Sequence, residues 1–218
     1  MSDVIISINN LTKQFGEDTV LNSVTVSFER GKIHGVVGRN GSGKTVMFKC
    51  ICGFIPSTSG EIIVDGKTIG RDTDIPDSVG IIIEAPGFLP NYDGFHNLKF
   101  LAEISGSIND ERIRDTIRLV GLDPDSRKHV GKYSMGMRQR LGIAQAIMEN
   151  PEILILDEPF NGLDTTGVEE MRALLLSLKE QGKTILVASH YKEDVDYLCD
   201  TVIRMDKGQI IERINASV

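Results

Sequence analysis

The stretch GRNGSGKT, residues 38–45, consists of glycines, small polar residues and two cations, and it matches the pattern G-x-x-x-x-G-K-[ST]. Glycines let the backbone curl so that successive N–H groups point at phosphate oxygens, and a following helix adds its positive N-terminal end. The apolar segment KIHGVVG (32–38) is typical of a strand, and GKTVMFKCICG (43–53) has helical spacing. The sequence therefore predicts a phosphate-binding loop; the alternative is a chance glycine-rich connection between strand and helix.

The residues of this loop have separate expected tasks. The Lys44 ammonium is expected to reach the β- and γ-phosphates of a nucleotide, and the Thr45 hydroxyl can ligate Mg²⁺. The residues predicted to contact the nucleotide are Gly38, Arg39, Asn40, Gly41, Ser42, Gly43, Lys44 and Thr45. Kinases, GTPases, helicases and transport ATPases all use such a loop, so the choice among them depends on the rest of the chain.

The bulk properties of the chain narrow its possible partners. Its 218 residues suit one domain, and 40% hydrophobic with 25% charged residues is an ordinary globular composition. The formal net charge of −7 argues against nucleic acid as the main partner, because phosphate-binding surfaces are usually basic. The start lacks signal-peptide features, and no apolar run approaches the roughly 20 residues of a membrane helix. We therefore expect contact with a membrane only through a partner protein.

The three cysteines are expected to be reduced core residues. Cys50 and Cys52 lie two apart in an apolar stretch, and Cys199 is distant in sequence. No second cysteine pair or histidine lies near them to complete a metal site, so buried thiols are the favoured interpretation.

The order of the predicted elements indicates an α/β fold with a helical insertion at about 85–150. The predicted strands are 4–9, 24–28, 32–38, 61–66, 152–157, 183–189, 201–206 and 209–214. The predicted helices are 43–53, 95–105, 109–122, 137–150, 166–182 and 191–200. Because strands alternate with helices in the last third, parallel pairing with right-handed crossovers is expected there.

Two carboxylates end a predicted buried strand in ILILDEP, residues 153–159. Asp157 can hold Mg²⁺ through water, and Glu158 is placed to reach an attacking water as a general base. The alternative is an ordinary polar end to a buried strand. His190 ends another apolar strand, in VASH, where it could contact a γ-phosphate or orient the catalytic water, or be purely structural.

The segment YSMGMRQRLGIAQAI, residues 133–147, begins with Ser134 and Gly136 ahead of an amphipathic helix. A helix N-terminus with a hydroxyl is suited to an anion. A second anion site raises the possibility that two chains share a nucleotide. The alternative is simple N-capping by Ser134.

Taken together, these motifs resemble the nucleotide-binding subunit of an ATP-binding cassette (ABC) transporter, since the glycine loop, YSMGM, ILILDE, NGLD and VASH come in that family's order and spacing. The resemblance implies one ABC ATPase domain over 1–218. It implies a P-loop NTPase (RecA-like) α/β core with an N-terminal antiparallel β subdomain and an inserted α-helical subdomain. It also implies ATP and Mg²⁺ as cofactors, an ATP-dependent dimer, most simply a homodimer, and an integral membrane permease as partner at the cytoplasmic face.

The resemblance also implies residue roles near the base and at the dimer contact. Phe15 matches the aromatic residue that stacks on adenine, although it could instead belong to the core. Ser134 and Gly136 match the family signature, which reaches the γ-phosphate held by the opposite subunit. Asp164, in NGLD, matches a loop that signals across the dimer.

Around the γ-phosphate, the implied roles agree with the chemistry of the residues. Asp157 matches the Mg²⁺ aspartate, Glu158 the catalytic glutamate and His190 the switch histidine. The residues expected to act in catalysis are Glu158, His190 and Lys44, and those expected to hold metal are Thr45, Glu84 and Asp157.

Two positions depart from the common family pattern. Met137 stands where the signature usually has glutamine, and Glu84, in IIIEAPGFLPN, stands where a glutamine contacts Mg²⁺ and faces the membrane partner. A carboxylate is a stronger Mg²⁺ ligand, but it adds negative charge near Asp157 and Glu158. Both departures resemble the ATPase subunits of exporters for antimicrobial peptides, of the lantibiotic-immunity and bacitracin-resistance type.

The expected function is therefore ATP hydrolysis that powers export of an antimicrobial peptide or drug through a separate permease. One alternative is a soluble ABC ATPase acting on a macromolecular complex, and its usual second cassette or long coiled-coil insertion is not found in this sequence. The other is a P-loop phosphotransferase, which would need neither the Ser134 signature nor a dimer.

Overall fold

The computed structural model of the chain describes residues 3–106, 108–190, 195 and 197–215. The strands are β1 (Val4–Phe15), β2 (Asp18–Glu29), β3 (Ile33–Val37), β4 (Ser59–Val64), β5 (Lys67–Thr68), β6 (Val79–Ile82), β7 (Ile153–Asp157), β8 (Thr184–Ser189), β9 (Thr201–Asp206) and β10 (Gln209–Asn215). The α-helices are α1 (Lys44–Ile51), α2 (Gly94–Ser105), α3 (Asp110–Leu119), α4 (Met135–Ile147) and α5 (Thr165–Glu180), and a 3-10 turn η1 (Val130–Lys132) precedes α4.

The N-terminal part is an antiparallel sheet with strand order β2-β1-β4-β5. Strands β1 and β2 form a long hairpin whose turn contains Gly16 at φ +61°, in the left-handed region that glycine adopts easily. Both strands extend well beyond the predicted 4–9 and 24–28. Polar positions such as Gln14 and Thr19 also pair across the hairpin, although they carry no apolar alternation.

The second sheet has the strand order β10-β9-β3-β8-β7-β6. Strand β3 pairs in parallel with β8 and β9, and β7 pairs in parallel with β8 and β6, as the alternation of strands and helices predicted. Strand β6 was missed by sequence reasoning because its four residues stand directly before a Pro/Gly-rich segment. Gly80 in β6 lets α4 come close: a Cβ there would lie 1.9 Å from the Ala146 carbonyl oxygen.

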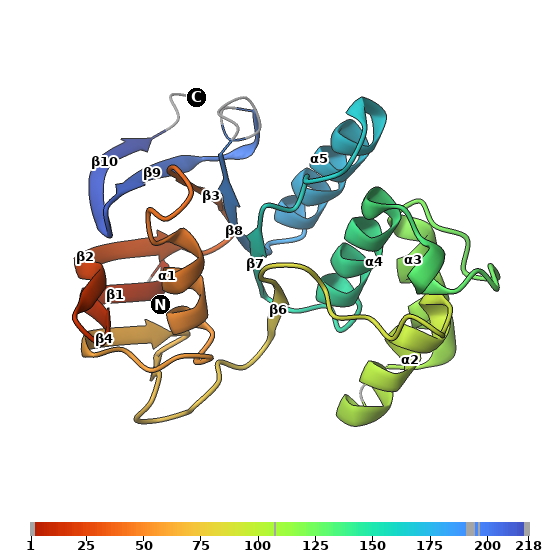
Figure 1. Ribbon diagram of the computed structural model, residues 1–218, viewed down its shortest axis with the longest axis horizontal. Coiled ribbons are helices and arrows are strands. Elements are labelled where there is room, and N and C mark those ends of the chain that lie inside the picture. Colours follow the sequence, from red (N-terminus) through yellow and green to blue (C-terminus); the bar gives the residue numbers. More distant parts are fainter. Residues whose placement is uncertain (1–2, 107, 191–194, 196, 216–218) are drawn as a thin grey trace.

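Helix α1 lies between the two sheets, and its apolar side chains enter a core that both sheets share (Figure 1). Met47, Phe48 and Ile51 are fully buried there. Cys50 and Cys52 belong to the same core, and burial raises the pKa of Cys50 to about 11 and of Cys52 to about 12. Both thiols are therefore protonated at neutral pH, as expected for core cysteines.

The opposite face of the second sheet packs on α5 and on the helices of the insertion. Strand β7 contributes to both cores: Ile153 and Ile155 pack on the α1 side, whereas Leu154 and Leu156 face the other core. A strand that is apolar on both faces is typical of the centre of a parallel sheet. This burial fixes β7 firmly, so the residues that follow it have a rigid support.

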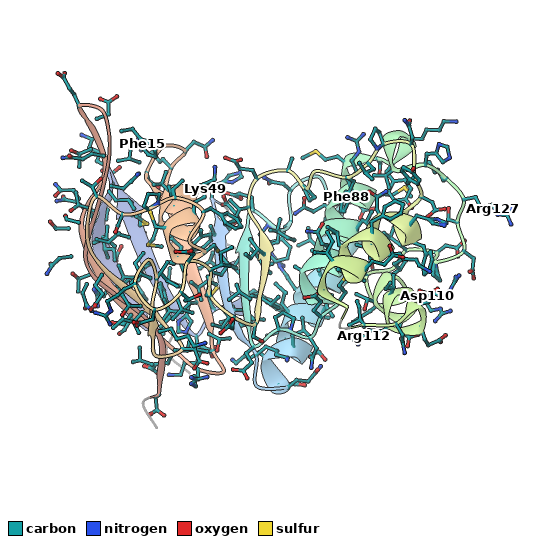
Figure 2. All side chains as sticks on the ribbon, turned by 90° about the horizontal axis from the view of Figure 1, so that it is seen from below. Phe15, Lys49, Phe88, Asp110, Arg112 and Arg127 are labelled. Carbon is teal, nitrogen blue, oxygen red and sulfur yellow. The ribbon has the colours of Figure 1, made fainter. Side chains whose placement is uncertain are left out.

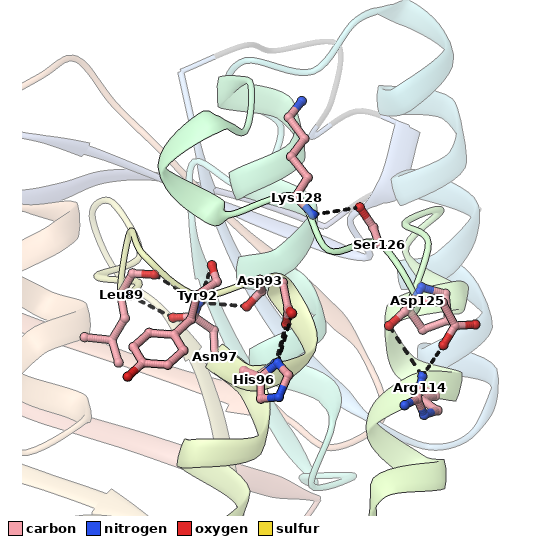
Figure 3. Close-up of polar contacts among 10 residues, drawn as sticks. Leu89, Tyr92, Asp93, His96, Asn97, Arg114, Asp125, Ser126 and Lys128 are labelled. Carbon is pink, nitrogen blue, oxygen red and sulfur yellow. Dashed lines mark hydrogen bonds and ion pairs between the residues drawn. The ribbon is translucent and has the colours of Figure 1, made fainter.

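The helices α2, α3 and α4 lie together beyond β6, at the right of Figure 1. Asp93 caps α2 by accepting a hydrogen bond of 2.8 Å from the His96 N–H. The buried Asn97 side chain accepts from the Leu89 N–H (2.7 Å) and donates to the carbonyls of Leu89 and Tyr92 (Figure 3). These bonds fix the loop that runs from β6 into the helices.

The remaining predicted elements are found close to their expected bounds. The predicted helix at 191–200 falls largely on positions outside the described residues. Strands β9 and β10, predicted at 201–206 and 209–214, close the sheet next to β3.

Candidate nucleotide-binding site

The glycine loop connects the carboxyl end of β3 to the first residue of α1. Gly41 (φ +79°) and Gly43 (φ +104°) have backbone conformations that other residues rarely adopt. A Cβ on Gly43 would also lie 2.8 Å from the Leu21 Cδ2 atom. The loop therefore needs glycine at this position for both its turn and its packing.

The back of the loop is held by the turn between β9 and β10. The Gly208 N–H donates to the Ser42 carbonyl at 3.0 Å, and a Cβ on Gly38 would lie 2.5 Å from the Met205 carbonyl oxygen. The Ser42 hydroxyl is buried and has no hydrogen-bond partner among the described residues. A buried hydroxyl of this kind has unused hydrogen-bonding capacity.

Lys44 and Thr45 connect the loop to the end of β7. Lys44 is 5% exposed, and its ammonium donates to the Gly38 carbonyl at 2.8 Å. The Thr45 hydroxyl donates to Asp157 Oδ2 at 2.5 Å. A cleft of about 310 Å³ lies over these groups and is lined by Val20, Asn40, Gly41, Ser42, Gly43, Lys44, Thr45, Val46, Asp157 and Glu158.

These groups suit a nucleotide and its metal ion. Backbone N–H groups of a glycine-rich loop, a helix N-terminus and one ammonium are the usual ligands of a polyphosphate. The Thr45 hydroxyl and the Asp157 carboxylate are oxygen ligands of the kind that Mg²⁺ prefers. The residues present therefore fit MgATP.

The Asp157 carboxyl has a raised pKa. Burial is the largest cause, the charge of Glu158 and that of Glu84 add to it, and the hydrogen bond from Thr45 opposes it. Because the folded pKa lies above the unfolded one, the ionised carboxylate destabilises the native state at neutral pH. That cost disappears as the pH falls through the folded pKa.

We expect Asp157→Asn to raise the melting temperature of the chain at neutral pH without nucleotide or metal. Asparagine keeps an oxygen for the Thr45 hydroxyl and removes the buried charge. A gain of about 1 kcal/mol corresponds to roughly 2–4 °C for a chain of this size. Differential scanning fluorimetry checks this, with Asp77→Asn, an exposed carboxylate paired with Lys67, as control. A lower melting temperature for Asp157→Asn alone would contradict the inference that the buried Asp157 charge destabilises the native state.

Glu158 and His190 meet at the carboxyl ends of neighbouring strands. Glu158 Oε2 lies 2.9 Å from His190 Nδ1, and the two side chains are 20% and 39% exposed. The Glu158 N–H donates to the Ala188 carbonyl at 2.9 Å, which anchors the residue to β8. Sequence reasoning predicted both residues but not their contact. The arrangement can hold a carboxylate in a fixed orientation beside the phosphate cleft.

Glu84 follows β6 and forms an ion pair with Lys49 of α1, at 2.7 Å between Lys49 Nζ and Glu84 Oε1. Sequence reasoning missed Lys49, because nothing in its local pattern marks it. Glu84, Asp157 and Glu158 line one further cleft of about 550 Å³. The Glu84 carboxylate is therefore near the predicted metal ligands, and its charge is balanced from the side of α1.

Ser134 and Asp164 both act as helix caps in the structure. The Ser134 hydroxyl accepts from the Met137 N–H at 3.2 Å at the start of α4, and Asp164 accepts from the Gly167 N–H at 2.9 Å at the start of α5. Gly136 lies so close to the loop between β7 and α5 that a Cβ on it would be 2.8 Å from the Gly162 carbonyl oxygen. The described lining of the cleft around Lys44 contains neither Ser134 nor Gly136.

Phe15 is the last residue of β1 and lies at one end of the strands of the antiparallel sheet (Figure 2). Its side chain is 48% exposed, with the Lys13 ammonium 4.8 Å from the ring centroid. This exposure excludes the alternative that Phe15 is a core residue. An exposed aromatic face is available for stacking.

None of the described helices combines the length and the apolar character that crossing a bilayer requires.

Over residues 21–161 the chain matches the family described as ABC transporter. It is 41% identical to the bacitracin transport ATP-binding protein BcrA of Enterococcus faecalis, over 99% of this chain and 70% of that one. It is 37% identical to the lantibiotic transport ATP-binding protein SrtF of Streptococcus pyogenes, over 95% of this chain and 89% of that one.

The fold is similar to that of the ATP-binding cassette MJ0796 in a dimeric, post-hydrolysis state bound to ADP and Pi. The TM-score is 0.88 at 23% identity, over 98% of this chain and 99% of that one. This likeness confirms the predicted fold class, an α/β core with an antiparallel sheet before it and helices inserted into it.

Proposed function

This chain belongs to the ABC transporter family and is an ATP-hydrolysing subunit, and we propose that its ATP hydrolysis powers a separate integral membrane permease that exports an antimicrobial peptide or drug. The observation that carries this proposal is the cleft where Lys44, Thr45, Asp157 and Glu158 meet, with His190 bound to Glu158. We also propose that residues 1–218 act as a single ATPase domain.

The proposed reaction transfers the γ-phosphoryl group of ATP to water. Lys44 and the loop N–H groups hold the phosphates, and Thr45 and Asp157 would hold Mg²⁺, which neutralises charge on the β- and γ-phosphates when bound. Glu158 takes a proton from the attacking water, whose oxygen forms a bond to the γ-phosphorus while the bond to the ADP oxygen breaks. His190 holds the Glu158 carboxylate in place.

Glu84 is the proposed additional metal ligand that replaces the usual glutamine. In the structure the Glu84 side chain is 64% exposed, forms an ion pair with Lys49 and lines the same cleft as Asp157. Burial is the main cause of the raised pKa of Asp157, and the charge of Glu84 adds to it.

We propose that two copies of the chain bind two ATP molecules at their interface. Ser134 and Gly136 at the start of α4 would contact the nucleotide of the second copy, as the resemblance implies. Their position outside the cleft of their own chain supports this division, and so does the dimeric state of MJ0796. Asp164 lies in the adjoining loop, where it would face the partner copy.

The proposed contact with the permease is a groove of about 670 Å³ between β6 and the helices α2 and α4. Phe54, Leu101 and Ile104 line it, and Phe54 and Ile104 are 52% and 83% exposed. Large exposed apolar side chains in a groove are typical of a protein-binding surface. Through it the chain would sit peripherally on the cytoplasmic face of the membrane, and no role in nucleic-acid binding is proposed.

The names of BcrA and SrtF support an antimicrobial peptide as cargo, since they refer to bacitracin and lantibiotic transport. The alternative, a soluble ABC ATPase acting on a macromolecular complex, is not favoured by these relatives.

The first test is an affinity purification of the tagged chain from detergent-solubilised membranes of its host. We expect near-equal recovery of a polytopic membrane protein, whose identity points to the cargo. Ile104→Glu should abolish this recovery, whereas Leu119→Glu should not, because Leu119 is also an exposed apolar residue but does not line the groove. Recovery of soluble partners alone would favour the alternative, a soluble ABC ATPase that acts on a macromolecular complex. Equal recovery with both variants would reject the groove as the contact.

A further inference from the structure

The backbone of Glu158 is held in an uncommon conformation. Its φ is +52°, which costs energy for a residue with a side chain. The Glu158 N–H donates to Ala188, and its carbonyl accepts from the Asn161 N–H at 3.2 Å. The same carbonyl also accepts a hydrogen bond of 3.3 Å from the side-chain Nε2 of Gln139, which lies on α4. The backbone of Glu158 is therefore held by three hydrogen bonds, one each with Ala188, Asn161 and Gln139.

Gln139 is a buried amide at a position where the helix is otherwise apolar. Its side chain is 8% exposed, and the neighbouring buried residues of α4 include Leu141, Ile143 and Ala144. A buried amide destabilises a protein unless it is hydrogen-bonded. The bond to the Glu158 carbonyl is the contact that accounts for a polar residue here.

Helix α4 also touches the loop after Glu158 at two other points. A Cβ on Gly136 would lie 2.8 Å from the Gly162 carbonyl oxygen, and a Cβ on Gly162 would lie 2.5 Å from the Met135 side chain. The first two turns of α4 therefore lie directly on residues 158–164. A displacement of α4 must carry along, or break, its contacts with that loop.

We propose that Gln139 is a positioning residue for Glu158, through which the position of α4 sets the rate of ATP hydrolysis in the same chain. The inference rests on the proposed function, in which Ser134 at the start of α4 contacts the nucleotide of the second copy. Binding of that nucleotide fixes α4, Gln139 transmits the position to the Glu158 carbonyl, and the peptide plane sets the direction of the Glu158 side chain. Each nucleotide thus affects hydrolysis of the other.

The amide group, and not the mere bulk of Gln139, is what the proposal requires. Gln139→Met keeps the length and packing of the side chain but removes the N–H donor. The Ala188 and Asn161 bonds remain, so the chain should fold while the Glu158 carboxylate loses orientation. Because small misplacements of a catalytic group cost large factors in rate, we expect kcat to fall about 10-fold.

The experiment compares the full chain with its Gln139→Met and Thr116→Val variants. Thr116 is a fully buried hydroxyl of α3 that donates to the Arg112 carbonyl, so it controls for loss of a buried polar group. The measurements are kcat, KM for ATP, the Kd of a fluorescent ATP analogue, the Hill coefficient for ATP and the melting temperature. For Gln139→Met we expect the lower kcat, a Kd within about 2-fold of the parent and a Hill coefficient closer to 1. Thr116→Val should keep the parent values of kcat and Hill coefficient.

The double variant separates positioning from a general structural effect. In the Glu158→Gln background, Gln139→Met should not lower the residual rate further, because the group it positions has been removed. A parent kcat and Hill coefficient for Gln139→Met would overturn the proposal, as would a full additive loss in the double variant. If Glu158→Gln alone keeps the parent rate, the proposed role of Glu158 fails instead.

Discussion

We expect Glu158→Gln to lower the rate of ATP hydrolysis by about 10²–10⁴-fold, the usual range for loss of a general base. The amide cannot take the proton of the attacking water, but it keeps the size of the side chain and an oxygen to face His190, which lies 2.9 Å from the carboxylate. The phosphate loop and the metal ligands are unchanged, so ATP still binds. Bound ATP then persists and holds two copies together.

Release of phosphate and size-exclusion chromatography with ATP and Mg²⁺ measure both effects. The matched control is Glu152→Gln, which replaces a carboxylate at the other end of β7, exposed and 3.5 Å from Arg30. The control should hydrolyse ATP at the parent rate. A parent rate for Glu158→Gln would show that another group accepts the proton, and a monomeric variant with bound ATP would contradict the shared-nucleotide dimer.

We expect Lys44→Ala to weaken ATP binding by about 10²-fold. Hydrogen bonds to charged groups are worth about 1.5–3 kcal/mol each, and the ammonium is expected to make such bonds to two phosphates. Without nucleotide its observed partner is the Gly38 carbonyl, at the edge of the same loop. The substitution therefore removes a phosphate ligand without disturbing the two apolar cores.

Isothermal titration with ATP gives the Kd, and a melting curve without nucleotide reports on folding. Lys67→Ala, which removes an exposed ammonium paired with Asp77, is the control and should bind ATP like the parent. Unchanged ATP affinity for Lys44→Ala would reject the phosphate assignment. A much lower melting temperature of Lys44→Ala without nucleotide would show that Lys44 stabilises the fold and is not mainly a phosphate ligand.

Much of the proposed site could be predicted because its residues sit in local patterns. The glycine loop needs only the order strand, loop and helix, and Asp157, Glu158 and His190 end apolar strands whose parallel pairing brings those ends together. The contacts of Lys49 with Glu84 and of Gln139 with Glu158 were not predicted. Both join side chains of a helix to loops distant in sequence, and no local periodicity encodes such a meeting.

Strand β6 and the environment of Phe15 also could not be predicted from local sequence patterns. Strand β6 is four residues long, and its pattern merges with the Pro/Gly-rich segment, so only its pairing with β7 reveals it. Phe15 could be read either as core or as exposed because an aromatic residue at a strand end fits both descriptions, and only the three-dimensional surface decides.

The strand order of the second sheet bears on how this protein is made. Strand β3, which carries the glycine loop, pairs with β8 and β9, and the loop itself is held by Gly208. These partners are separated from β3 by some 150 residues or more, as the bond between the Ile33 N–H and Asp200 illustrates. Contacts so distant along the chain form slowly. On the ribosome the phosphate loop is therefore synthesised well before the strands that support it, so ATP can stabilise the new chain only after β8, β9 and Gly208 have been made.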